Sequence, residues 1–307
     1  MSEKLYLLGH PVAHSKSPAM HNALYQKLNV PWEYGLKDCE SVSEACSFLE
    51  SGAFLGANIT TPYKPQAFDH ADVKAATAKL AGGANVLVRK GEALLGYNKD
   101  GEGCVSYLER AGFTFNGAQV VVCGTGPTSL AILFAAAIAG AARVVLVGRD
   151  KLKAQRTLEE RLALFQAMAY ATVELPAAKS GHRSFREAYE ETEFSFGSYD
   201  SAGAAIAHAD LVVNATPLGM GKDDVPPFDT SLLQEGQTVF DVVYGHGLTG
   251  LVEAARDKGC RAYDGRGMLV AQAVASAIVF FEVAGLDVSA TEEEMFAIMA
   301  KAAGLEC

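Results

Sequence analysis

Two pairs of polar side chains in this sequence have the types and settings needed to bind a small polar molecule and move a proton. Ser15 and Ser17 lie two residues apart in a polar loop after the apolar run 5–8. In an extended backbone both hydroxyls point to one side, and each can donate and accept a hydrogen bond. Lys64 and Asp100 each lie near the end of a later predicted strand. A lysine and an aspartate that face one substrate hydroxyl form an acid–base pair, in which the carboxylate holds the ammonium in place.

Each pair also has an ordinary structural interpretation. Ser17 precedes Pro18, which suits the first position of a helix expected over residues 18–28, so Ser17 could simply cap that helix. Lys64 and Asp100 could form a surface salt bridge worth about 0–1 kcal/mol, and their spacing alone favours this interpretation. Two serines, a histidine and two prolines in one loop nevertheless favour a binding site at the carboxyl end of a strand.

A glycine-rich loop further along the chain has the form of a dinucleotide-binding turn. Gly124 and Gly126 lie between an apolar strand pattern and an apolar helical pattern, and Ser129 takes the third position of the fingerprint. The first glycine permits the tight turn, the second lets backbone amides approach a pyrophosphate, and the helix start attracts the phosphates. A turn without a ligand is the alternative, but the complete βαβ frame favours a dinucleotide. The expected cofactor-binding loop comprises Gly124, Gly126, Pro127, Thr128 and Ser129.

The two residues expected to contact the cofactor ribose favour different cofactors. Arg149 and Asp150 follow the next predicted strand, about twenty residues after the glycines. Arg149 could pair with a 2′-phosphate and thus favours NADP. Asp150 could accept a hydrogen bond from a free 2′-hydroxyl and thus favours NAD, or it could cap the following helix. The choice between the two cofactors stays open at this point.

Alternating apolar and amphipathic patterns predict the elements that position these residues. This alternation is typical of parallel sheets covered by helices, and a lysine-glycine-glutamate turn predicts one hairpin. The domain boundary is expected near residue 103, with the last helices returning to the first domain. The predicted strands are 5–8, 32–36, 54–59, 85–89, 94–97, 119–123, 143–147, 211–214 and 238–243, and the predicted helices include 18–28, 42–49, 75–80, 103–111 and 130–139.

The segment 151–202 is less regular. It is rich in charged residues and helix formers, and residues 180–184 and 195–199 are interpreted as loops. The sequence leaves open whether this segment forms a lid, a partner surface or an inert insertion.

Bulk composition excludes several classes of protein. A length of 307 residues suits two domains, and a net charge of −10 argues against a general nucleic-acid binder. The six cysteines form no CxxC pair, so we expect no metal site and free thiols in the cytoplasm. The apolar stretch 268–286 contains Gln272 and Glu282 and is interpreted as a packed helix. We therefore expect no membrane segment.

Motifs spread over nearly the whole chain give a more specific indication. Each motif is weak alone, but together they resemble the shikimate dehydrogenases and the similar quinate/shikimate dehydrogenases. The matching segments are Gly9–Asn22, Asn58–Lys64, Asn85, Asn98–Gly101, the Gly124 loop, Asn214–Met220, Asp241–Tyr244 and Gly265–Ala273.

The resemblance implies an α/β fold with an N-terminal substrate domain and a Rossmann-like dinucleotide-binding domain. The substrate domain would comprise residues 1–102, completed by 268–307, and the Rossmann domain residues 103–267. Lys64 and Asp100 would be the catalytic acid–base pair. The implied substrate-binding residues are Ser15, Ser17, Asn58, Thr60, Asn85, Asp100, Tyr244 and Gln272, and the further implied cofactor-binding residues are Thr216, Gly265 and Met268.

The implied activity is the reversible reduction of 3-dehydroshikimate to shikimate, a step towards the aromatic amino acids. NADP is the implied cofactor, with NAD as the alternative. The partner would be this small-molecule substrate, without nucleic acid or membrane, in a cytoplasmic monomer or homodimer. Two alternatives remain: an NAD-dependent dehydrogenase of quinate or an analogue, and a non-catalytic sensor of shikimate or a nucleotide.

Several positions depart from the family pattern. Lys99 stands where threonine is usual, and it could lower the pKa of Lys64, bind a substrate carboxylate or point to solvent. Val86 replaces a threonine and Pro127 a glycine, and residues 148–150 differ from the sequence typical of NADP-using members. These departures concern substrate identity and cofactor preference.

Overall fold

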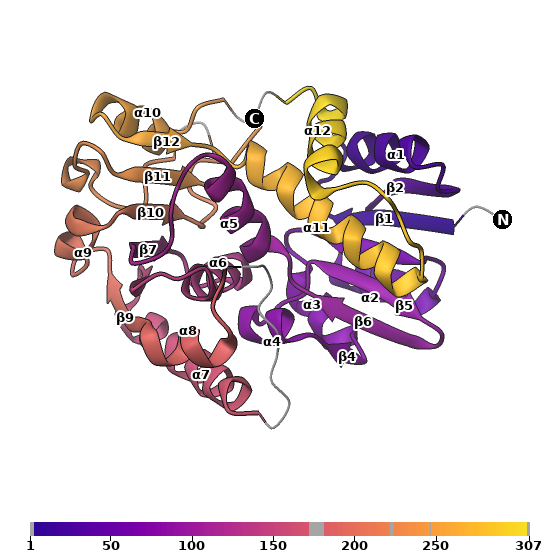
Figure 1. Ribbon diagram of the computed structural model, residues 1–307, viewed down its shortest axis with the longest axis horizontal. Helices are drawn as coiled ribbons and strands as arrows, with labels where there is room; N and C mark the ends of the chain where they lie inside the picture. Colours follow the sequence, from indigo (N-terminus) through magenta and orange to yellow (C-terminus); the bar gives the residue numbers. More distant parts are fainter. Residues whose placement is uncertain (1–2, 172–180, 222–223, 246, 306–307) are drawn as a thin grey trace. The chain divides into compact units, whose positions relative to one another are not determined.

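The chain divides into two compact units, which are described separately. The computed structural model describes residues 3–171, 181–221, 224–245 and 247–305. Residues Met1–Gly103 and Gly267–Cys307 form the first unit, and residues Cys104–Arg266 form the second (Figure 1). Each unit contains a six-stranded sheet and several helices, which confirms the expected α/β class.

The sheet of the first unit is mixed, so the expectation of parallel sheets is wrong for this unit. β1 pairs in parallel with both β2 and β3, whereas β5 is antiparallel to β3 and β6. The predicted hairpin accounts for the antiparallel pairing of β5 with β6, because a two-residue connection joins antiparallel strands, whereas β5 meets β3 through a long-range contact. In sheet order the strands are β2 (Trp32–Asp38), β1 (Glu3–Gly9), β3 (Gly56–Ile59), β5 (Val86–Lys90), β6 (Ala93–Tyr97) and β4 (Val73–Lys74).

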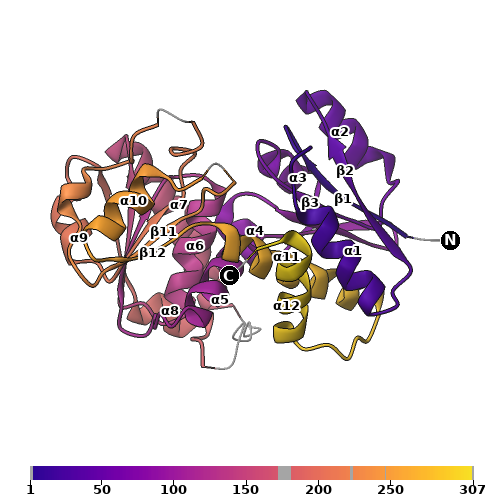
Figure 2. The ribbon, with the colours of Figure 1, turned by 90° about the horizontal axis from the view of Figure 1, so that it is seen from above.

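Helices from both ends of the chain pack in the first unit. α12 packs on α1, and the views in Figures 1 and 2 show α11 beside them. α11 is long and apolar enough to cross a membrane, but 72% of its most apolar window is buried in the protein, as in a core helix. The helices are α1 (Ser17–Lys27), α2 (Val42–Ser51), α3 (Lys64–His70), α4 (Ala76–Ala81), α11 (Arg266–Ala284) and α12 (Glu292–Ala303).

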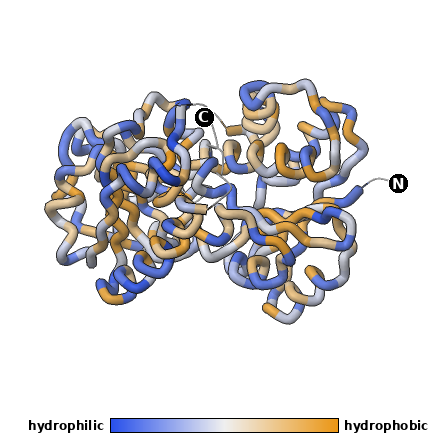
Figure 3. The backbone as a smooth tube through the Cα atoms, turned by 60° about the horizontal axis from the view of Figure 1, so that its bottom comes forward, coloured by the Kyte–Doolittle hydropathy of each residue, from blue (hydrophilic) through white to orange (hydrophobic). Residues whose placement is uncertain are grey.

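The second unit contains the fully parallel sheet that the sequence predicts. Its four central strands are nearly continuous apolar runs because helices cover them, and Figure 3 shows hydrophobic, orange segments in the interior of the protein. In sheet order the strands are β12 (Arg261–Tyr263), β11 (Thr238–Asp241), β10 (Leu211–Asn214), β7 (Gln119–Cys123), β8 (Arg143–Gly148) and β9 (Glu193–Ser198). The helices are α5 (Asp100–Arg110), which begins in the first unit, α6 (Pro127–Ile138), α7 (Lys151–Ala169), α8 (Phe185–Glu191), α9 (Gly203–His208) and α10 (Gly250–Asp257), with a 3₁₀ turn η1 at Thr230–Leu232.

The interpretation of residues 195–199 as a loop is wrong for most of that segment. Residues 195–198 belong to β9, which pairs in parallel with β8 along its whole length. Aromatic residues at alternate positions, Phe194 and Phe196, give the period of a strand, and Phe194 packs on Phe134. The described residues of the segment 151–202 therefore form α7, α8 and the edge strand β9 of the sheet. Part of the loop expected at 180–184 lies outside the described residues.

Candidate functional site

Lys64, Asn85 and Asp100 meet in the first unit. Lys64 begins α3, Asn85 precedes β5 and Asp100 begins α5. The Lys64 ammonium donates to Asp100 Oδ2, and Asn85 Nδ2 donates to Asp100 Oδ1 at 2.7 Å. The side chains of Lys64 and Asp100 are 15% and 8% exposed. Because each carboxylate oxygen accepts from a different neighbour, the carboxylate is fixed in place and can hold the lysine towards a substrate oxygen.

The chain around Asp100 folds so as to support this carboxylate. Asn98 Oδ1 accepts the Asp100 N–H at 3.0 Å, and Asn98 Nδ2 donates to the carbonyl of Gly83 at 2.9 Å. The Lys99 N–H donates to Asn85 Oδ1 at 2.8 Å, which sets the direction of the Asn85 amide. Asp100 also lies at the start of α5, where the helix dipole favours a negative charge. The sequence analysis expected this helix to begin at Gly103 and so missed this role of the helix start.

The side chain of Lys99, which directly precedes α5, has a partner in the first turn of that helix. Its ammonium lies 2.5 Å from Glu102 Oε2, and its side chain is 18% exposed. Of the three interpretations offered for Lys99, a side chain that points freely to solvent is wrong. Glu102 balances the additional positive charge close to the acid–base pair.

Ser15 and Ser17 also lie together. Ser15 Oγ donates to Ser17 Oγ at 3.2 Å and accepts the Ser17 N–H at 3.2 Å. The two hydroxyls meet because the backbone turns there, with the Ser15 N–H donating to the Val12 carbonyl, and not because it is extended. Ser17 is the first residue of α1 and makes no capping bond, so its interpretation as a helix cap is wrong.

Close backbone contacts bring the loop that contains these serines to Thr60. A Cβ on Gly9 would lie 2.2 Å from Thr60 Cγ2, so only glycine fits there. The His10 N–H also donates to the Thr61 carbonyl at 3.1 Å. The loops after β1 and β3 therefore run side by side, as expected for the carboxyl ends of neighbouring parallel strands.

The side chain of Asn58 connects three elements, whereas that of Gln272 makes a hydrogen bond within its own helix. Asn58 is buried, accepts from the Tyr34 hydroxyl at 2.8 Å and donates to Ser276 Oγ at 2.8 Å, which ties β3 to β2 and α11. Gln272 Nε2 donates to the Leu269 carbonyl at 2.8 Å, within α11. The sequence analysis did not identify Tyr34 or Ser276, because neither residue belongs to a recognisable local motif.

Gly103 is a further residue whose role the sequence analysis missed. A Cβ at this position would lie 2.6 Å from Gln272 Cβ and 2.7 Å from the Gln272 backbone nitrogen. Only glycine allows the first turn of α5, which contains Asp100, to approach α11 this closely. A glycine in the first turn of a predicted helix was the available signal.

In the second unit, Gly124 and Gly126 have different physical roles. Gly124 has φ +115°, and a Cβ there would lie 2.4 Å from Ser129 Oγ, so the turn requires glycine. A Cβ on Gly126 would meet open space, so its backbone is accessible to a ligand. Pro127 begins α6, which places the helix start directly after the glycines. This arrangement fits the phosphates of a dinucleotide.

Ser129 has a structural role in this loop. Its side chain is fully buried, and Oγ donates to the carbonyl of Ala215 at 3.2 Å. Ser129 therefore closes the loop onto the end of β10, and its hydroxyl does not face solvent. Thr216 is held close by, since its Oγ1 donates to Asn214 Oδ1 at 2.7 Å.

Asp150 and Arg149 differ clearly in their surroundings. Asp150 Oδ1 accepts the N–H groups of Leu152 and Lys153 at 2.9 and 3.1 Å, so the capping role considered for Asp150 is present. Arg149 is exposed. Burial raises the pKa of the Tyr199 phenol, and the positive charge of Arg149 opposes that shift, which places the guanidinium near Tyr199. Of the two side chains, Arg149 is the one available to a phosphate group.

The remaining expected residues belong to different units. Tyr244 lies in the second unit and is 38% exposed, and Gly265 lies so close to the Val242 carbonyl that a Cβ would be 2.2 Å from its oxygen. Met268 is buried in α11 of the first unit. Among the residues that the structure describes, no three His, Cys, Asp or Glu side chains are grouped to hold a metal ion.

Comparisons with known proteins agree with this geometry. Residues 7–87 match the family described as the shikimate dehydrogenase substrate binding domain. A shikimate dehydrogenase (NADP(+)) of Symbiobacterium thermophilum is 36% identical over 272 residues, which cover 87% of this chain and 85% of that protein. The chain belongs to the shikimate dehydrogenase family. It is therefore an oxidoreductase, as the motifs indicated.

Solved structures of the family have the same fold. Shikimate 5-dehydrogenase from Thermus thermophilus, in complex with NADP(H) and shikimate, matches with a TM-score of 0.75 and 26% identity, covering 98% of this chain and 100% of that one. Quinate dehydrogenase from Corynebacterium glutamicum, in complex with NAD, matches with a TM-score of 0.74 and 27% identity, covering 98% and 99%. The fold thus occurs in a shikimate dehydrogenase in complex with NADP(H) and in a quinate dehydrogenase in complex with NAD.

Proposed function

We propose that the protein catalyses the reversible NADP-dependent reduction of 3-dehydroshikimate to shikimate. Membership of the family supports the reaction, and one observation carries the assignment of roles. This observation is the buried Asp100 carboxylate, which is held by Asn85 on one oxygen and by the Lys64 ammonium on the other. A lysine fixed in this way can exchange a proton with a substrate oxygen.

Lys64 acts as the general acid in the reductive direction. A bound NADP(H) supplies the hydride chemistry. The Lys64 ammonium donates a proton to the carbonyl oxygen that becomes a hydroxyl, and in the oxidative direction neutral Lys64 accepts that proton. Asp100 keeps Nζ in position through both directions, and Asn85 keeps Asp100 from rotating.

The polar side chains around this pair supply substrate recognition. Shikimate has a carboxylate and several hydroxyls, and a site built from hydroxyl and amide groups rejects an analogue that leaves those groups unpaired. The loops of Ser15 and Thr60 run side by side in the first unit, which supports a shared role. The proposed substrate-binding residues are Ser15, Ser17, Asn58, Thr60, Asn85, Tyr244 and Gln272.

The polar and charged groups of the second unit likewise match the chemical groups of NADP. The open backbone at Gly126 and the start of α6 suit the pyrophosphate, and the exposed Arg149 suits a 2′-phosphate. One oxygen of Asp150 is already used in capping α7, which makes it a weaker partner for a free 2′-hydroxyl. Thr216, Gly265 and Met268 are proposed as further cofactor contacts.

The test is a four-way assay of shikimate and quinate against NADP⁺ and NAD⁺, followed by NAD(P)H absorbance. We expect the highest kcat/KM for shikimate with NADP⁺. A higher value for quinate with NAD⁺ would favour the alternative that Asp150 motivates, a quinate/shikimate dehydrogenase. Binding of shikimate or a nucleotide without turnover in any combination would contradict the enzyme and favour a sensor.

The assembly and the compartment are parts of the same proposal. We expect a monomer or homodimer without nucleic-acid or membrane partners, in the cytoplasm. Light scattering of the purified protein would determine the mass, and fractionation of the source cells would place it. A larger assembly or a membrane-bound fraction would contradict this expectation.

A further inference from the structure

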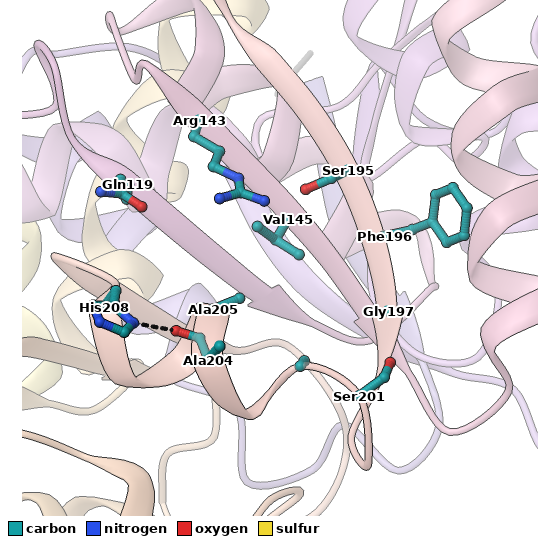
Figure 4. A pocket seen from close by; sticks show the side chains of 11 residues that line it. Gln119, Arg143, Val145, Ser195, Phe196, Gly197, Ser201, Ala204, Ala205 and His208 are labelled. Atoms are coloured by element: carbon teal, nitrogen blue, oxygen red, sulfur yellow. Dashed lines mark hydrogen bonds between the residues drawn. The ribbon is translucent and has the colours of Figure 1, made fainter.

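A pocket of about 490 Å³ lies on one face of the second unit's sheet (Figure 4). Side chains of β7, β8, β9 and α9 line it, and none of the proposed cofactor residues does so. Gln119 and Arg143, which line it, are the first residues of their strands, whereas the glycine loop follows the last residue of β7. No role in the proposed reaction uses this pocket.

The strand register explains which side chains face the pocket. Val145 pairs with Ser195, and Arg143 lies two residues before Val145, so all three side chains lie on one face of the sheet. Phe196 points to the opposite face in Figure 4. Gly197 adds no side chain, and α9 has only six residues, so it covers little of the sheet beside it.

Two polar atoms of this pocket are buried without a hydrogen-bond partner among the described residues. They are Ser195 Oγ and Arg143 Nε. Arg143 Nε does form an ion pair with Glu193 Oε1 at 3.4 Å, but the two side chains are 41% and 66% exposed, so this pair is weak. A buried polar group without a partner costs about 1–3 kcal/mol, so a ligand that accepts from these donors would recover that free energy.

We propose that this pocket binds a small organic monocarboxylate. Arg143 and Ser195 supply donors for one carboxylate group, and Val145 and Ala205 supply an apolar wall for its carbon skeleton. The volume lies in the range of small-molecule sites. A dianionic phosphate fits less well, because Arg143 is the one arginine or lysine that lines the pocket, and the Glu193 carboxylate lies beside it.

Benzoate is a suitable probe, since it combines one carboxylate with a compact apolar ring. We would titrate it into the full-length protein and follow backbone amide signals by NMR, with NADPH and shikimate present to occupy the proposed active site. For a ligand of this size we expect a Kd of about 1 mM. The saturable shifts should concentrate at Gln119, residues 195–197 and residues 204–208.

Two variants and two further probes make the test specific. Arg143→Gln should weaken benzoate binding at least about tenfold, because charge-assisted hydrogen bonds are lost. Arg261→Gln is the matched control, since Arg261 is an exposed arginine that begins the edge strand β12 of the same sheet and does not line the pocket, and it should bind benzoate normally. Inorganic phosphate and neutral benzamide should both bind much more weakly.

Four results would overturn the proposal. They are the absence of saturable shifts in the pocket, equal binding by the Arg143→Gln variant, equal binding of phosphate or benzamide, and displacement of benzoate by NADPH or shikimate. The pocket lies within the second unit and its test uses no catalytic readout, so it stands or falls separately from the proposed function.

Discussion

Replacing Asp100 by asparagine tests the central network with almost no change in shape. Both oxygens of Asp100 act as acceptors, one for Lys64 and one for the Asn85 amide. Asparagine offers one acceptor and one donor, so either Lys64 or Asn85 must then face a donor with its own donor. In either orientation of the new amide, Lys64 loses its counter-charge. In addition, either Lys64 or the Asn85 amide loses its hydrogen-bond acceptor.

The expected magnitude follows from burial. The two side chains are 15% and 8% exposed, so the remaining Lys64 ammonium would be largely desolvated and would lose the carboxylate charge of Asp100. Breaking a buried pair on one side costs about 3–5 kcal/mol, and a positioned acid–base group contributes about 10²–10⁴-fold to the rate. We expect Asp100→Asn to lower kcat by about 10²–10⁴-fold, with a much smaller change in KM.

A double-mutant cycle with Lys64→Met distinguishes one functional unit from two independent residues. If the pair acts as a unit, the double variant should lose about as much kcat as either single variant. Independent effects would multiply to about 10⁴–10⁸-fold. The assay follows NADPH formation from shikimate, with thermal unfolding as a check on folding. Asp72→Asn is a matched control, because Asp72 is an exposed aspartate of the same unit that accepts only the Leu94 N–H. Multiplying losses, or near-normal kcat in either single variant, would refute the reasoning.

Three further predictions concern cofactor choice, acid stability and Lys99. Arg149→Gln should raise the KM for NADP⁺ about tenfold or more and leave the KM for NAD⁺ little changed, because only NADP⁺ carries the 2′-phosphate; equal effects on both cofactors in steady-state assays would contradict this. Burial lowers the pKa of His21 from 6.5 to about 3. Below pH 6.5 this histidine is therefore protonated in the unfolded chain but stays neutral in the folded protein, so the free energy of unfolding decreases as the pH falls. Between pH 7 and 5 the free energy of unfolding, measured with urea, should fall by about 2 kcal/mol because of His21. The His21→Phe variant cannot titrate at this position and should not show this part of the decrease. The same pH dependence in the variant and the unchanged protein would contradict the role of His21. Lys99→Thr keeps the backbone donor to Asn85 and removes only the pair with Glu102, so kcat/KM for shikimate should stay within about fivefold, and a hundredfold change would show that the Lys99 ammonium acts on the substrate.

The sequence predicted most strands of the fold because their burial dictates their composition. β7 and β10 match their expected bounds, since continuous apolar runs between turns leave little choice. β9 was missed because its serines and glycine are common in loops, while its alternating phenylalanines were the better signal. The mixed order of the first sheet depends on long-range pairing of β3 with β5, which local patterns do not encode.

The candidate site was predictable as a set of residues but not as a network. Asn98 was recognised only as part of a motif, yet its side chain fixes the start of the helix that carries Asp100. Tyr34 and Ser276 reach Asn58 from β2 and α11, far away in the sequence. Contacts of this kind arise from the tertiary fold, so neither spacing nor residue type could reveal them.

The two units contain similar carboxylate–amide pairs, which differ in the second donor that each carboxylate holds. Asp241 is fully buried, accepts from the Asn214 amide at 2.9 Å and from the Thr249 hydroxyl at 2.6 Å, and burial raises its pKa. Asp100 also accepts from an amide, but its second partner is the partly exposed Lys64. Neutral donors around Asp241 fix the ends of β10 and β11. Asp100 instead holds a charged ammonium, so the replacement of one hydroxyl donor by an ammonium separates a structural carboxylate from the one that we propose to be catalytic.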